Sequence, residues 1–149
     1  MNRSNSDRMT DEVILAARIL LVALFLVFGW AKLTNYTGTV GYMAQAGTPL
    51  PAVAAIVAVV VEFFCAIAVL IGVGTRPLAL LMALYTLATA LIGHHFWTMM
   101  GPPRIGAAIN FYKNISIIGG FLLLYITGAG RYSLDAWLAK DPGATLRSA

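Results

Sequence analysis

Charged residues are scarce in this chain of 149 residues. Asp, Glu, Lys and Arg together make up 11% of the sequence, whereas an average soluble domain contains about 25%. Hydrophobic residues make up 60%, and the mean hydropathy is +0.82. A chain of this length forms one domain. Its composition excludes a soluble monomer.

Cysteine and the signatures of common cofactor sites are also missing. Cys65 is the single cysteine, which excludes an internal disulfide and a cysteine-based zinc or iron–sulfur site. There is no phosphate loop, dinucleotide fingerprint, CxxC, haem-attachment motif or HExxH. We expect no metal at His94 and His95, since adjacent residues diverge by about 100° on a helix. With no covalently bound cofactor, electrons must come from a substrate, a diffusible quinone or a partner protein.

The basic excess does not indicate nucleic acid. Ten Lys and Arg against six Asp and Glu give a formal charge of +4. These basic residues are scattered and form no stripe or nucleic-acid motif, so we expect no nucleic-acid partner. We interpret them as signals of membrane orientation.

Long apolar segments fill most of the chain. A helix needs about 20 mostly apolar residues to cross a bilayer, and four segments meet this requirement: residues 13–33, 50–73, 77–97 and 109–129. The sequence therefore predicts an all-α integral membrane four-helix bundle. Its expected organisation is a tail of residues 1–12, a transmembrane domain of residues 13–138 and a tail of residues 139–149. Turn residues predict loops over 34–48 and 99–106.

The distribution of basic residues predicts the orientation. If the N-terminus is cytoplasmic, the inside holds seven basic residues: Arg3, Arg8, Arg18, Arg76, Arg131, Lys140 and Arg147. The outside then holds three: Lys32, Arg104 and Lys113. The positive-inside rule thus favours cytoplasmic placement of both termini. A cleaved signal peptide is the disfavoured alternative for the first span, because Asp7, Asp11 and Glu12 precede it.

Small and polar residues predict which face of each span is buried. The predicted inner face of the second span carries Ala55, Ala58, Glu62, Cys65 and Ala66, and that of the third carries Ala79, Ala83, Thr86, Ala90 and His94. On the first, the face comprises Arg18, Leu21, Phe25, Gly29 and Lys32. On the fourth, it comprises Asn110, Lys113, Ser116, Gly120, Thr127 and Arg131, with Asn114 at its edge. Every span thus brings an ionisable residue to its predicted inner face.

Depth in the membrane separates Glu62 from the other ionisable residues. Glu62 is expected near the midplane, where a charge costs at least ~2.5 kcal/mol, so it needs a partner or stays protonated. Lys32, His94 and Lys113 are expected at the outer ends of their spans. We predict an outward-facing pocket with Glu62 at the bottom. The alternatives are a structural carboxyl, snorkelling lysines and an interfacial histidine. Cys65 is expected to be a packing residue, and Arg18 and Arg131 to anchor the inner ends at the lipid surface.

The order of these residues resembles the DoxX family of small four-helix membrane proteins. The resemblance covers residues 18–138. It rests on these residues: Arg18, Phe28, Gly29, Lys32, Leu33, Gly47, Thr48, Pro49, Glu62, Gly72, Gly74, Thr75, Arg76, His94, Phe96, Trp97, Phe111, Lys113, Asn114, Gly119, Gly120, Gly128, Gly130, Ser133, Leu134 and Asp135. It implies a multi-pass protein of the cytoplasmic (inner) membrane, linked to oxidoreduction of thiosulfate, to thiols or to oxidative stress.

Three functions remain open from the sequence. The first is a subunit of a quinone-linked oxidoreductase, catalytic only with a partner, in which Glu62 and His94 are the catalytic candidates and Lys32, Lys113 and Asn114 bind the substrate. The second is a non-enzymatic scaffold that docks a soluble redox partner on the bilayer. The third is a pathway for small solutes or protons, which intramembrane ionisable residues also signal.

Overall fold

The computed structural model describes residues 5–139 of the chain, which are helical throughout with short connections. The helices are α1 (Asn5–Thr34), α2 (Tyr36–Gln45), α3 (Pro51–Val59), the π-helix η1 (Val60–Cys65), α4 (Ala66–Ile71), α5 (Thr75–Gly93), the 3₁₀-helix η2 (Phe96–Thr98), α6 (Pro102–Thr127) and α7 (Leu134–Leu138). Four stretches are long and apolar enough to cross a membrane: Asn5–Thr34, Pro51–Ile71, Thr75–Thr98 and Pro102–Thr127. This confirms the predicted all-helical membrane protein with four spans.

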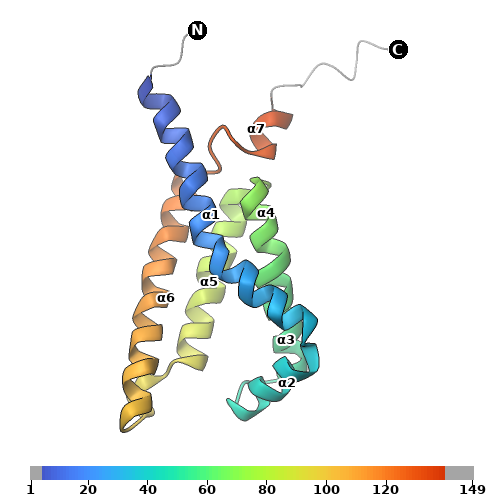
Figure 1. Ribbon diagram of the computed structural model, residues 1–149, viewed down its shortest axis with the longest axis vertical. Helices are drawn as coiled ribbons and strands as arrows, with labels where there is room; N and C mark the ends of the chain where they lie inside the picture. Colours follow the sequence, from blue (N-terminus) through green and yellow to red (C-terminus); the bar gives the residue numbers. More distant parts are fainter. Residues whose placement is uncertain (1–4, 140–149) are drawn as a thin grey trace, which may run out of the picture.

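The four spans form a bundle with two different ends (Figure 1). At one end, which we call the terminal end, α1 begins and α7 folds back beside the end of α4. At the other end, α2 and η2 connect the spans. Of the residues that predict the orientation, Arg3, Lys140 and Arg147 lie outside the described residues, as does most of the expected C-terminal tail. Cytoplasmic placement of the termini stays a prediction.

The core of the bundle lies toward the terminal end. Val22, Val69, Ala79, Met82 and Phe121 are fully buried there and come from all four spans. Close packing of this kind replaces the hydrophobic effect as the force that holds helices together in lipid.

The predicted inner faces are confirmed for three spans. On the second span Ala55, Ala58, Glu62 and Ala66 are buried, and on the third Ala79, Ala83, Thr86 and Ala90 are buried. On the first, Arg18, Phe25 and Gly29 are buried, while Lys32 is half-buried.

The predicted inner face of the fourth span is not buried as a whole, although Asn110 and Gly120 are half-buried. Lys113, Ser116, Thr127 and Arg131 are exposed, and α6 instead buries Ala107, Phe121 and Leu124. The physical reason is that α6 packs chiefly along α5, so apolar contacts with one neighbour decide its buried face. The polar side of α6 borders cavities instead of the core.

Two predicted loops contain helix. Residues 36–45 form α2, whose N-terminus is capped by the Asn35 side chain accepting a hydrogen bond from the Gly38 amide. Pro102 and Pro103 begin α6, because proline fits the first helical turn, where no amide donor is needed. The turn signals in these segments thus mark helix starts as well as connections.

The expectation that Arg18 anchors α1 at the lipid surface is wrong. Arg18 is 1% exposed. Its guanidinium donates hydrogen bonds to the carbonyl oxygens of Ala129 at 2.5 Å, Leu70 at 2.8 Å and Tyr132 at 2.8 Å. The side chain therefore ties α1 to the end of α4 and to the segment after α6, and we call this contact the Arg18 clamp.

Candidate functional site

Glu62 is held by two side chains from the neighbouring spans. Lys32 Nζ on α1 lies 2.6 Å from Glu62 Oε2, and the hydroxyl of Tyr85 on α5 donates to Glu62 Oε1 at 2.6 Å. Glu62 is 8% exposed. A buried carboxylate is stable only when its charge is paired and its oxygens are hydrogen-bonded. The Lys32–Glu62–Tyr85 triad meets both conditions and connects three of the four spans.

Local backbone structure places Glu62 against α1. Glu62 lies in η1, and π-helical turns inside α-helices are frequent at functional sites. Gly29 faces this turn. A Cβ atom added at Gly29 would lie 2.7 Å from the carbonyl carbon and oxygen of Glu62. The absence of a side chain at Gly29 therefore lets α1 approach closely enough for Lys32, one turn later, to reach the carboxylate.

Beyond Lys32 the bundle opens into a cavity of about 640 Å³, which we call the hollow. Its polar lining includes Lys32, Asn35, His94, Asn110, Lys113 and Asn114. The apolar part of the wall of the hollow includes Leu24, Phe28 and Ile117. None of the described residues that line the hollow is a carboxylate. The charge of Lys32 is balanced by Glu62, and the ammonium group of Lys113 makes the hollow attractive to anionic or electron-rich groups.

The structure places the predicted site residues at two levels. Lys32, His94, Lys113 and Asn114 line the hollow. Glu62 does not line it; the carboxylate lies behind Lys32, with which it is paired. Lys32, His94 and Lys113 were the candidate partners for Glu62, and Lys32 makes the ion pair. His94, at the end of α5, and Lys113, on α6, line the hollow instead. The catalytic and binding roles of these residues stay predictions.

Tyr85 and the residues of α2 that border the hollow were not predicted as part of the site. Tyr85 stands next to Thr86 in an apolar run, and its hydroxyl was the available signal, because a buried tyrosine needs a hydrogen-bond partner. Asn35, Thr39 and Tyr42 border the hollow from the α2 side. They lie in the segment that was expected to be a loop.

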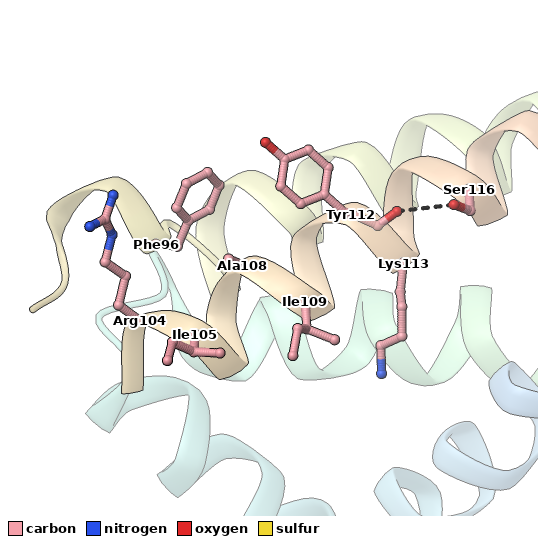
Figure 2. A pocket seen from close by; sticks show the side chains of 8 residues that line it. All are labelled: Phe96, Arg104, Ile105, Ala108, Ile109, Tyr112, Lys113 and Ser116. Atoms are coloured by element: carbon pink, nitrogen blue, oxygen red, sulfur yellow. Dashed lines mark hydrogen bonds between the residues drawn. The ribbon is translucent and has the colours of Figure 1, made fainter. Parts of the chain in front are cut away.

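A second cavity, also of about 640 Å³, lies on the exposed side of α6 (Figure 2). It is bordered by Phe96, Arg104, Ile109, Tyr112 and Lys113. In Figure 2 the Lys113 side chain points away from the rings of Phe96 and Tyr112. Lys113 borders both cavities, so its ammonium group stands between the hollow and this outer surface.

Comparison with known proteins identifies the family. The DoxX family model matches residues 13–95, more than half of the chain. This chain belongs to the DoxX family. The match includes Arg18, Lys32, Glu62, Tyr85 and His94, and it ends before α6. Within residues 5–139 there is no group of three His, Cys, Asp or Glu side chains that could hold a metal ion.

Two bacterial relatives of this DoxX family member are similar over nearly their whole length. Inner membrane protein YphA of Escherichia coli K12 is 53% identical over 83% of this chain and 88% of the relative. Inner membrane protein YqjF of the same organism is 41% identical over 89% of this chain and 97% of the relative. These relatives and the four apolar helices support a multi-pass inner membrane protein.

A more distant relative is found in yeast. The ER-derived vesicles protein ERV29 of Saccharomyces cerevisiae is 27% identical over 89% of this chain but over 36% of the yeast protein. No solved structure matches the chain.

Proposed function

We propose that this DoxX family member is the membrane component of a quinone-linked oxidoreductase system, and that the hollow binds a quinone headgroup, alone or together with a small anion. The electrons would come from a soluble redox partner acting on thiosulfate, a thiol or a product of oxidative stress. That class of partner is the one that the family resemblance implies.

One observation carries the proposal: Lys32 borders the hollow and is also paired with Glu62, which accepts the hydroxyl hydrogen bond of Tyr85. Reduction of a quinone to a quinol takes up protons as well as electrons. A carboxyl group one side chain away from the bound headgroup suits proton transfer, provided that it lies within hydrogen-bond reach directly or through a water molecule. Glu62 does not line the hollow, so a proton would pass between Glu62 and the headgroup by way of the Lys32 ammonium group, which does line it.

The lining of the hollow suggests a division of roles. Lys32 and Lys113 would stabilise the negative charge that develops on a quinone oxygen or is carried by an anion, since fixed cations stabilise developing negative charge. His94 would donate to a quinone carbonyl, and Asn114 would help to orient it. The aromatic and aliphatic wall at Phe28 and Ile117 offers a surface for a planar ring.

Bound quinone is the direct test of the proposal. The protein is purified in mild detergent, and extracted quinone is quantified by ultraviolet absorption. We expect quinone to co-purify with the native chain and to be lost in Lys113→Gln. Arg104→Gln is the matched control, because it removes one cation from the same region without lining the hollow. Absence of quinone from the native protein, or equal loss in both variants, would contradict the proposal.

A scaffold that docks a soluble partner is the second candidate function. It is favoured by the exposure of Tyr42 and Met100, at 71% and 92%, on the connections at the hollow side. Glu62→Gln separates the two functions. If partner association and thermal stability persist while quinone-linked reduction is lost, the scaffold interpretation fails. Unchanged reduction with lower stability would support it.

A solute or proton pathway is the third candidate. The fully buried side chains of Val22, Met82 and Phe121 fill the core toward the terminal end, which counts against a continuous polar path. Proteoliposomes that show no solute flux and no proton leak would exclude this function.

A further inference from the structure

The terminal end contains a polar cavity that the proposed function does not use. The start of α5 and the segment after α6 form it, with a volume of about 460 Å³. Its polar lining includes Thr75, Arg76, Ser133 and Asp135, and we call it the terminal cavity. Gly128 forms part of the wall, and a Cβ there would lie 3.2 Å from Arg76 Nε. Glycine thus leaves room for the guanidinium at the cavity edge.

Thr75 is a buried polar group without a partner. It is 2% exposed, and its hydroxyl has no hydrogen bond among the described residues. Thr75 and Arg76 also open α5, a helix of 19 residues. The backbone amides of Thr75 and Arg76 lack intrahelical acceptors, whereas Pro77 has no amide hydrogen. The helix dipole favours negative charge at this end. The terminal cavity therefore offers a hydroxyl and backbone donors at one place.

Arg76 and Asp135 give the terminal cavity both signs of charge. Arg76 is exposed, and its guanidinium makes a long contact of 3.4 Å with the Ile126 carbonyl oxygen. Asp135 Oδ2 accepts a hydrogen bond from the Gly74 amide at 2.8 Å, while Oδ1 has no partner within residues 5–139. A cavity lined by one cation and one carboxylate matches a zwitterion better than an anion.

We propose that the terminal cavity binds the phosphoethanolamine headgroup of a membrane phospholipid. Arg76, the Thr75 hydroxyl and the first amides of α5 hold the phosphate, and Asp135 accepts a hydrogen bond from the ammonium group. A quaternary ammonium could not donate that bond. The cavity lies where α5 begins and α6 ends, which is the level of lipid headgroups for spans of this length.

The neighbouring surface suits the rest of such a lipid. An apolar groove of about 510 Å³ between α1 and α6 is lined by Ile14, Leu20, Leu123 and Thr127. Thr127 borders this groove and the terminal cavity alike. A headgroup in the terminal cavity therefore places an acyl chain within reach of the groove, which favours an intact lipid over a free phosphate ester.

The test is native mass spectrometry of the purified full chain with lipids that share the same acyl chains. We expect phosphatidylethanolamine to bind about tenfold more tightly than phosphatidylglycerol or phosphatidylcholine, the effect of one charge-assisted hydrogen bond. Arg76→Gln should weaken binding about tenfold, Thr75→Val should weaken it less, and Asp135→Asn should abolish the preference for ethanolamine. Arg131→Gln is the matched control, a cation lost nearby but outside the terminal cavity, and it should leave affinity and preference unchanged.

Three results would overturn the inference. One is equal affinity of the native chain for the three lipids. Another is an equal effect of Arg76→Gln and Arg131→Gln, which would indicate attraction by surface charge alone. The third is binding of soluble glycerophosphoethanolamine as tight as that of the lipid, which would show that the ligand need not be a membrane lipid. Because Asp135 also caps Gly74, Thr75→Val and Arg76→Gln keep the test valid if Asp135→Asn fails to fold.

Discussion

The two ends of the bundle bury basic side chains in opposite ways. At the terminal end, the guanidinium of Arg18 donates to three backbone carbonyl oxygens from two chain segments. At the hollow, the ammonium of Lys32 is paired with the carboxylate of Glu62 and remains a quarter exposed as a side chain, at 24%. A backbone carbonyl group can only accept a hydrogen bond, whereas a carboxyl group can also take up and release a proton. The Arg18 clamp therefore fixes the chain at the terminal end, whereas the Lys32–Glu62 pair has the groups that the proposed proton transfer needs.

The largest expected effect is on the Arg18 clamp. Arg18→Met removes three buried hydrogen bonds. It should destabilise the protein by about 3 kcal/mol or more, because each charge-assisted bond contributes about 1.5–3 kcal/mol. Thermal unfolding in detergent, followed by circular dichroism, measures it. Arg131→Met, which removes an exposed side chain, is the control. Equal losses in the two variants would contradict the structural role of the clamp.

Gly29→Ala should have a smaller effect on stability than Arg18→Met. The added Cβ would lie 2.7 Å from the backbone of Glu62, so α1 must move away, at a cost of about 1–3 kcal/mol. Gly119→Ala is the control, since its Cβ meets nothing within 4 Å, and it should be neutral or stabilising by up to about 1 kcal/mol. If both variants unfold at the same temperature, the close approach at Gly29 is not needed.

Tyr85→Phe tests the third member of the triad. Loss of one buried hydrogen bond to a charged group should cost about 1.5–3 kcal/mol at most and should lower quinone-linked reduction, since Glu62 loses one of its two partners. Tyr125→Phe, at an exposed position of α6, provides the comparison. Full reduction activity in Tyr85→Phe would restrict the proton-handling group to Lys32 and Glu62.

Lys113→Gln should have the smallest effect on stability. Lys113 is exposed, so the free energy of unfolding should change by less than about 0.5 kcal/mol. Bound quinone should nevertheless fall. A change in stability without a change in quinone content would place Lys113 in the framework of the hollow and not in its binding site.

Sequence pattern was sufficient for the parts of the fold that depend on one helix at a time. The small residues beside Glu62 on the second span and the Ala and Thr residues of the third span indicate the buried faces, because small side chains let helices approach. A carboxylate near the midplane needs a partner, and this argument left Lys32, His94 and Lys113 as candidates; the structure selects Lys32.

Features that depend on several elements were not predictable in the same way. The π-helical turn at Glu62 packs against Gly29, and no residue pattern marks it. The exposed polar side of α6 follows from its pairing with α5, which helical periodicity does not specify. The burial of Arg18 depends on a C-terminal segment that returns to α1 and α4 from far along the sequence. Tyr85 was overlooked because its neighbours read as apolar packing.

The central claim is that the hollow is an open ligand site beside the Lys32–Glu62 pair. It is tested most directly with Asn114→Cys in a Cys65→Ser background, labelled in intact cells by a membrane-impermeant thiol reagent, with and without a short-chain soluble quinone. The account predicts labelling from outside the cytoplasm and protection by the quinone, with no protection of a cysteine placed at Arg104. Failure of the Asn114 position to react, or equal reaction with and without quinone, would contradict it.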